Sequence, residues 1–138
     1  MNLFVYGSLM FPEVWEKITG LTSRGLPATL QDYAAHRIHD QSYPALIPVD
    51  GAVTRGILYT GLDAGTLRKL DDFEGGFYQR VEVSIQMEGK SRVPAWTYRA
   101  GSPEHPDILS ALWDAQHFVE NELRTFLQQD PGFSGDRS

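Results

Sequence analysis

The pattern of apolar and polar positions predicts short strands separated by turns in the first half of the chain. An uninterrupted apolar run over residues 3–6 ends at Gly7-Ser8, as expected of a buried strand that enters a tight loop. Asp50-Gly51 is a turn signal ahead of another strand. The remaining predictions here are a strand at 28–38, an extended segment with two prolines at 43–48, and a strand at 52–59.

Two short helices are expected among these strands. The first begins near Pro12, which suits the first turn of a helix, and ends at Gly20. The second has apolar residues at helical spacing over 62–70 and ends near Phe73. A hairpin then follows, with strands at 78–87 and 92–98 and a turn at 88–90.

The end of the chain has apolar residues at three- and four-residue steps, which predicts one long amphipathic helix from about Pro106 to Gln128. About six strands, short helices between them and this long C-terminal helix indicate an α+β protein. Because strands and helices do not alternate strictly, a sheet curled into a small mixed barrel is favoured over a doubly wound parallel sheet. We expect a single domain over residues 1–130 and a flexible polar tail at 131–138. The positions that define the helix are Ile108, Leu112, Ala115, Val119, Leu123 and Phe126.

The corner after the second predicted helix carries the first candidate for chemistry. Glu74 stands where that helix ends, and Gly75-Gly76 allow the chain to turn sharply. The helix macrodipole disfavours an exposed carboxylate at a C-terminal end by roughly 0.3–1 kcal/mol. Its position there therefore suggests a role other than helix stability. The alternative is a solvated acidic helix end formed together with Asp71 and Asp72.

The loop Tyr6-Gly7-Ser8-Leu9, between the first strand and the first helix, is the second candidate. A glycine lets the backbone approach a ligand closely, and consecutive N–H groups can cup an anion. The start of the following helix adds positive potential. A carboxylate is the natural guest of such a loop, although an ordinary structural turn has the same sequence pattern.

Composition excludes several classes of function. The 138 residues contain no cysteine, so there is no disulfide framework, thiolate metal site or cysteine nucleophile. A formal net charge of −6 argues against nonspecific binding to nucleic acid or to an anionic membrane surface. No apolar stretch reaches the length of a membrane span or a signal peptide, so we expect a soluble, cytoplasmic protein.

The other polar residues point less clearly to a site. His36 and His39 are three residues apart on a predicted strand, so their side chains point to opposite faces and make a poor metal pair. We therefore predict no metal. Each of Arg37, Arg55 and Arg80 can pair with a carboxylate of a ligand or of the protein itself.

Four segments occur in an order that resembles the gamma-glutamylcyclotransferase-like family, in particular its small bacterial and plant avirulence-response-like branch. They are Tyr6-Gly7-Ser8-Leu9, Tyr43-Pro44-Ala45, Leu70-Asp71-Asp72-Phe73-Glu74-Gly75 and Tyr78-Gln79-Arg80. The resemblance covers roughly residues 2–99. It implies a six-stranded mixed barrel with a pocket at one end.

The resemblance also implies roles for individual residues. The loop formed by Tyr6, Gly7, Ser8 and Leu9 is expected to hold the α-amino acid end of a γ-glutamyl group through backbone amides, and Glu74 to be the catalytic acid/base. Tyr78 is expected to line the pocket. Apart from the resemblance, we expect pocket walls formed by Tyr43, Arg37 and the region around Tyr78 to select the leaving amine. Burial beside aromatic residues predicts a raised pKa for Glu74.

The expected reaction is release of 5-oxoproline and a free amine from a small γ-glutamyl substrate, by an enzyme that needs no cofactor and is a monomer. The short connection at Gly75-Gly76-Phe77 lies in a region that varies among subgroups with different substrates, so the leaving amine stays open. Two alternatives also stay open. One is another amide-cleaving lyase or hydrolase of the same fold, and the other is a non-catalytic protein that only binds a small molecule.

Overall fold

The structure is a computed structural model that describes residues 1–22, 24–121, 124 and 127. Within these residues the α-helices are α1 (Pro12–Thr19), α2 (Ala64–Glu74) and α3 (Ala115–Asn121), and two 3₁₀ turns are η1 (Ser8–Met10) and η2 (Glu88–Lys90). The strands are β1 (Leu3–Val5), β2 (Leu26–Ile38), β3 (Pro44–Tyr59), β4 (Tyr78–Met87), β5 (Arg92–Ala100) and β6 (Ile108–Leu112).

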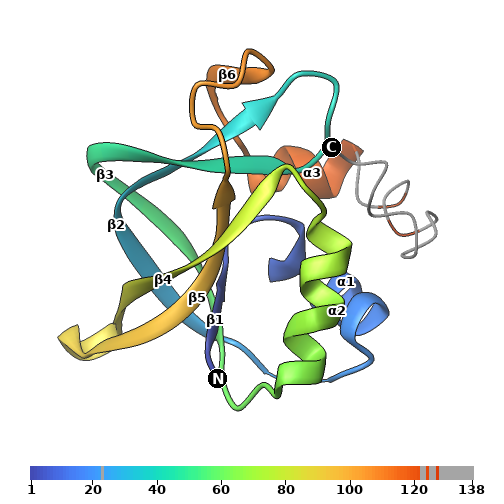
Figure 1. Cartoon of the computed structure of the whole chain (residues 1–138), viewed down its shortest axis with the longest axis vertical. Helices are drawn as coiled ribbons and strands as arrows, with labels where there is room; N and C mark the ends of the chain where they lie inside the picture. Colours follow the sequence, from blue (N-terminus) through green and yellow to red (C-terminus); the bar gives the residue numbers. More distant parts are fainter. Residues whose placement is uncertain (23, 122–123, 125–126, 128–138) are drawn as a thin grey trace.

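The strands form a closed barrel with one strand added outside the ring (Figure 1). The ring order is β3-β1-β5-β4-β2, and pairing between β2 and β3 closes it. β1 runs parallel to β5, whereas the other pairs are antiparallel, so the barrel is mixed. β6 pairs with β2 beyond the ring. The predicted α+β class and small mixed barrel are confirmed, with five of the six strands closing the barrel.

The apolar run of β1 is uninterrupted because both faces of the strand are buried. Leu3 and Val5 pack in a cluster with residues of α1 and α2, whereas Phe4 and Tyr6 pack in a second cluster inside the barrel. Gly56 of β3 lies against β1 so closely that an added Cβ would be 2.2 Å from the carbonyl oxygen of Val5. β1 therefore joins the helices to the barrel. It also determines where the loop over residues 6–9, which follows it, begins.

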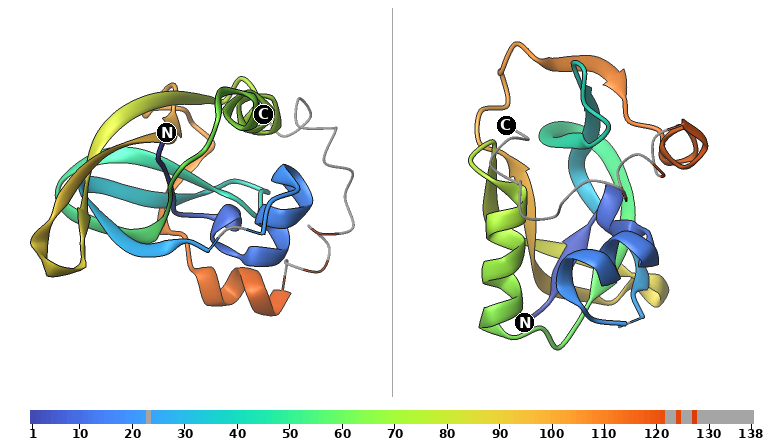
Figure 2. Two further views of the ribbon diagram at one scale, coloured as in Figure 1. Left: turned by 90° about the horizontal axis from the view of Figure 1, so that it is seen from below. Right: turned by 90° about the vertical axis from the view of Figure 1, so that its right-hand side faces the viewer.

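Both short helices have the ends that their sequences predict. Pro12 begins α1, and Gly20 ends it with a φ of 75°. The side chain of Asp63 caps α2 by accepting a hydrogen bond from the N–H of Thr66 at 2.7 Å. That bond lowers the pKa of Asp63. Figures 1 and 2 show the helices outside the barrel, on the side away from the tip of the β4–β5 hairpin. The antiparallel pairing of β4 and β5 confirms the hairpin predicted from the sequence.

The predicted turn at Asp50-Gly51 is wrong, because β3 runs through it without reversing. Gly51 takes a φ of +82°. Its N–H donates a hydrogen bond of 2.9 Å to Oδ1 of Asp32. Asp32 itself has a φ of 67° at a shift in the register between β2 and β3. The turn signal thus marks a bulge at which two long strands bend together.

The predicted long C-terminal helix is also wrong over its first part. Residues 108–112 form β6, which pairs with the free edge of β2 through His36–Leu112 and Ile38–Ile108. The helix begins only at Ala115. Pairing along a sheet edge satisfies the backbone as a helix would, so the helical spacing of apolar residues did not decide the structure. Most of the predicted helix after Asn121, the domain end at 130 and the tail at 131–138 lie outside the described residues.

Among the helices described, none is long and apolar enough to cross a membrane.

Candidate functional site

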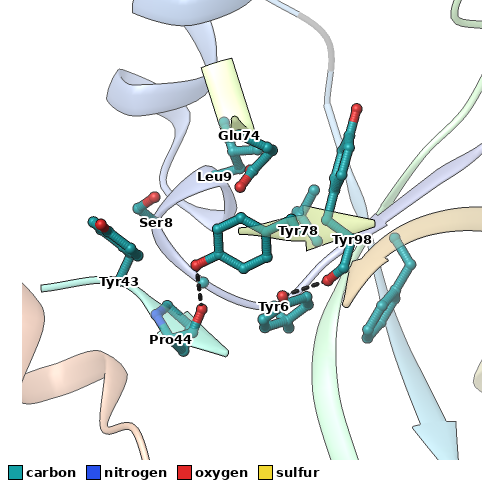
Figure 3. A pocket seen from close by; sticks show the side chains of 11 residues that line it. Tyr6, Ser8, Leu9, Tyr43, Pro44, Glu74, Tyr78 and Tyr98 are labelled. Atoms are coloured by element: carbon teal, nitrogen blue, oxygen red, sulfur yellow. Dashed lines mark hydrogen bonds between the residues drawn. The ribbon is translucent and has the colours of Figure 1, made fainter. Parts of the chain in front are cut away.

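A pocket at one end of the barrel brings the predicted site residues together (Figure 3). Its empty volume is about 340 Å³, which includes space open to solvent. The pocket is lined by the residues of the two candidate segments and by both tyrosines expected in its walls, namely Tyr6, Gly7, Ser8, Leu9, Tyr43, Glu74 and Tyr78. It is also lined by residues that the sequence reasoning did not assign to it, namely Phe4, Val5, Pro44 and Tyr98.

Glu74 is the last residue of α2 and is 9% exposed. Gly75 follows with a φ of 75°, and its N–H donates to the carbonyl of Asp71 at 3.1 Å, which ends the helix there. Figure 3 shows the Glu74 carboxylate turned toward Tyr78 and the loop of Leu9. A solvated acidic helix end is therefore wrong for Glu74, although Asp72 is exposed as that alternative expected. The raised pKa expected of Glu74 stays a prediction.

The loop after β1 approaches the pocket wall because residue 7 is a glycine. A Cβ added to Gly7 would lie 2.8 Å from two side-chain carbons of Pro44, so a larger residue would push the loop away. The carbonyl of Gly7 accepts a hydrogen bond from the N–H of Met10 at 3.0 Å, which forms the turn η1. The first N–H groups of a helical turn have no acceptor inside it, and here they belong to Ser8 and Leu9.

Tyrosine side chains fix the walls of the pocket. The Tyr78 hydroxyl donates to the carbonyl of Pro44 at 2.6 Å, which ties the start of β4 to the start of β3. The Tyr6 hydroxyl donates to the carbonyl of Tyr98 at 2.5 Å. The rings of Tyr43 and Tyr78 are tilted, with centroids 6.3 Å apart. Because these bonds join separate strands, the pocket has a defined shape before any ligand binds.

A hydrogen-bonded ion pair lies next to Glu74. Nε of Arg80 is 2.9 Å from Oδ1 of Asp71, and Nη2 of Arg80 is 3.2 Å from Oδ2. The Tyr98 hydroxyl donates to Oδ1 of Asp71 at 2.6 Å. Burial raises the pKa of Tyr98, and the hydrogen bond to Asp71 and the charges of Asp71 and Glu74 raise it further. Tyr98 therefore stays neutral and is a donor.

The role of Tyr98 was missed, although the hairpin contains the signal for it. Arg80 pairs with Tyr98 across β4 and β5. A turn centred on Gly89 places these two residues opposite each other, and opposite residues of an antiparallel pair share a face. The register of the predicted hairpin was therefore enough to place Tyr98 beside Arg80.

The other polar candidates lie away from the pocket lining. The ring Nδ1 of His36 is 2.7 Å from the carbonyl oxygen of Leu109, and His39 pairs with Asp40 at 3.3 Å on the exposed surface. Arg55 is exposed on β3, and Arg37 is half-buried on β2. A search of the residues that the structure describes finds no group of three or more side chains that could hold a metal.

Comparison with known proteins identifies one family. A family model described as "Gamma-glutamyl cyclotransferase, AIG2-like" matches residues 3–115. The chain is 30% identical over 128 residues to protein AIG2 C of Arabidopsis thaliana, covering 92% of this chain and 77% of that protein. A solution structure of an Arabidopsis thaliana protein with 27% identity superposes with a TM-score of 0.73, covering 92% of this chain and 85% of the other. A solved gamma-glutamyl cyclotransferase with 19% identity shares the fold, with a TM-score of 0.66 over 75% of this chain and 68% of the other.

Proposed function

This chain belongs to the AIG2-like gamma-glutamyl cyclotransferase family, and from that premise we propose that it releases 5-oxoproline and a free amine from a γ-glutamyl amine, amino acid or peptide. The observation that carries the proposal is a buried carboxylate, Glu74, in the same pocket as the glycine-containing loop over residues 6–9. We assign Glu74 as the general acid/base and the loop as the binding site for the α-amino acid end of the substrate.

The loop suits a carboxylate for two reasons. The N–H groups of Ser8 and Leu9 begin a helical turn, and backbone N–H groups at such a start can donate to an anion. Gly7 has no side chain and lies close against Pro44, so at this position only the backbone is available to a ligand. Tyr78, fixed by its bond to Pro44, would hold the glutamyl chain bent within the pocket.

The reaction needs little more than this bent conformation and a proton carrier. Glu74 accepts a proton from the α-ammonium group, and the freed amine attacks the γ-carbonyl carbon. A carbon–nitrogen bond forms and closes a five-membered ring. Glu74 then gives the proton to the leaving nitrogen, and the original amide bond breaks. The ring nitrogen, which still holds two hydrogens after the attack, gives one of them to the released amine, which leaves as an ammonium ion. Effective molarities of well-oriented intramolecular reactions reach about 10⁵ M or more, and proton transfer by a positioned group adds roughly 10²–10⁴-fold.

The burial of Glu74 suits this task. A carboxylate with its ordinary pKa of about 4.3 is a weak base at neutral pH. Removing its charged form from water raises the pKa and makes it a better proton acceptor. The mechanism uses no cofactor or metal, so we expect turnover to continue after dialysis against a chelator.

The test is incubation of the protein with γ-glutamyl amines, γ-glutamyl amino acids and γ-glutamyl peptides, with separate assays for 5-oxoproline and for the released amine. We expect both products in equal amounts from at least one class. Release of the amine with glutamate instead of 5-oxoproline would indicate hydrolysis. Binding measured by calorimetry without any product would indicate a binding protein and overturn the proposal.

A further inference from the structure

Two carboxylates one helical turn apart on α2 have different surroundings. Asp71 is half-buried and accepts two hydrogen bonds from Arg80 and one from Tyr98. Glu74 is buried and lines the pocket. Positions three residues apart are neighbours on a helix, so Asp71 and Glu74 share one face of α2.

The Asp71–Arg80 pair is held in place by side chains of β5. The Tyr98 hydroxyl donates to Asp71, and Tyr98 lines the same pocket as Glu74. Arg80 also lies over the ring of Trp96, with its guanidinium carbon 4.7 Å from the centroid. Tyr98 and Trp96, both on β5, therefore hold the pair in place.

Other charged and titratable groups lie on α2 itself, on the barrel and on the helices that pack with α2. On α2, Asp72 is exposed. From the barrel, Tyr78, Tyr98, Tyr6 and Tyr43 line the same pocket. α1 packs against α2, and its charged side chains, those of Glu13, Glu16 and Lys17, are exposed. α3 carries the half-buried His117 and the exposed Glu120, and its Phe118 packs in the same core cluster as Phe73. Among the carboxylate, lysine and arginine side chains named here other than Glu74, those of Asp71 and Arg80 are half-buried and the rest are exposed.

We propose that Asp71 and Arg80 are positioning residues that balance each other's charge beside Glu74, so that the glutamate gives up and takes its proton in the pH range of catalysis. In this arrangement Arg80 cancels the repulsion that Asp71 would exert on an ionised Glu74. Tyr98 keeps Asp71 in place as a neutral donor. The kinetic part of this inference rests on the proposed function, whereas the electrostatic part concerns Glu74 alone.

The proposal predicts shifts of opposite sign. Asp71→Asn removes the negative charge and leaves Arg80 unbalanced, so ionised Glu74 is favoured and its pKa falls. Arg80→Met keeps much of the side-chain stem over Trp96 but leaves Asp71 unbalanced, so ionised Glu74 is disfavoured and its pKa rises. We expect each shift to be about half a pH unit or more. The double variant should return close to the wild-type value.

The experiment is a pH titration of the whole chain labelled with ¹³C at the glutamate carboxyl groups, followed by NMR. The Glu74 signal is assigned by its absence in Glu74→Gln. Arg80→Lys is the matched control, because it retains the charge and should keep the Glu74 pKa within about 0.2 unit of wild type. Where Arg80→Met fails to fold, Asp71→Asn against Arg80→Lys decides the question by itself.

Opposite shifts that cancel in the double variant support the proposal. Shifts in the same direction, or shifts below about 0.2 unit in both single variants, overturn it, since a merely structural pair would not produce the sign pattern. The titration needs no substrate, so it is independent of whether 5-oxoproline forms. In an active enzyme, the acid limb of the kcat/KM profile should move with the same signs, because Glu74 must be ionised to accept a proton.

Discussion

The pocket at the end of the barrel and a groove on the side of the barrel differ in size and in the polar groups that line them. The groove lies along β2, β3 and β6 and has an empty volume of about 1110 Å³, against about 340 Å³ for the pocket, both including space open to solvent. It is lined mostly by apolar and small residues, among them Ala34, Ala52, Val53, Leu112 and Trp113. Tyr6 lines both cavities.

The smaller cavity has the convergent polar groups. The pocket lining includes a buried carboxylate at Glu74, the start of a helical turn at Ser8, and tyrosine hydroxyls held by backbone carbonyls. Among the described residues that line the groove, Arg55 has an exposed side chain and none has a carboxylate side chain. Proton transfer needs a group of suitable pKa within reach of the substrate, so volume alone predicts little about chemistry.

The largest effect is expected from Glu74→Gln. Glutamine keeps the shape and volume of the side chain but can neither accept nor return the proton. We expect kcat for 5-oxoproline release to fall by about 10²–10⁴-fold, with a smaller change in KM. Glu82→Gln, which changes an exposed carboxylate on β4, is the matched control and should retain wild-type kinetics. A Glu74→Gln variant with most of its kcat would remove Glu74 from the mechanism.

A smaller but clear effect is expected from Gly7→Ala. The new Cβ would lie 2.8 Å from the rigid ring of Pro44, so the loop and its amides must move. We expect kcat/KM to fall by about 10- to 100-fold, because small displacements of positioning groups are costly. Gly76→Ala is the control, since Gly76 is exposed and an added Cβ meets no atom within 4 Å. Equal losses in both variants would show that the close approach at Gly7 is not what matters.

Tyr78→Phe should have a weaker effect. It removes the hydroxyl that donates to Pro44 at 2.6 Å but keeps the ring that lines the pocket. We expect KM to rise about 3- to 10-fold and the free energy of unfolding to fall by about 1 kcal/mol, measured by urea denaturation. Tyr33→Phe, on β2 and outside the pocket lining, should leave KM unchanged. A change in stability without a change in KM would limit the Tyr78 hydroxyl to a structural role.

The sequence predicted the pocket well because local signals determine the segments that form it. Pro12 and Gly20 mark the ends of α1, and Gly75 marks the end of α2, so the loop after β1 and the Glu74 corner were both located from short stretches. That these two corners meet in one pocket depends on the closing of the barrel. Only the family resemblance supplied that part of the prediction.

What the sequence did not predict depends on contacts between distant segments. Residues 108–112 have helical spacing but form β6, because the edge of β2 offers backbone partners that no local pattern reveals. Asp50-Gly51 reads as a turn, yet its geometry is set by Asp32 on the neighbouring strand. Both errors fall on the side of the barrel that carries the groove.

The smallest effect on kinetics is expected from substitutions in the groove. Leu112 is 66% exposed and Val53 is 58% exposed, and both line the groove but not the pocket. Leu112→Ser and Val53→Thr reduce the apolar character of the groove without touching Tyr6, so kcat and KM should stay within about twofold of wild type for every γ-glutamyl compound tested. Loss of kcat/KM by 10-fold or more, confined to substrates with large leaving amines, would mean that part of the substrate reaches the groove. In that case the pocket would carry out the reaction, and the groove would select the leaving group.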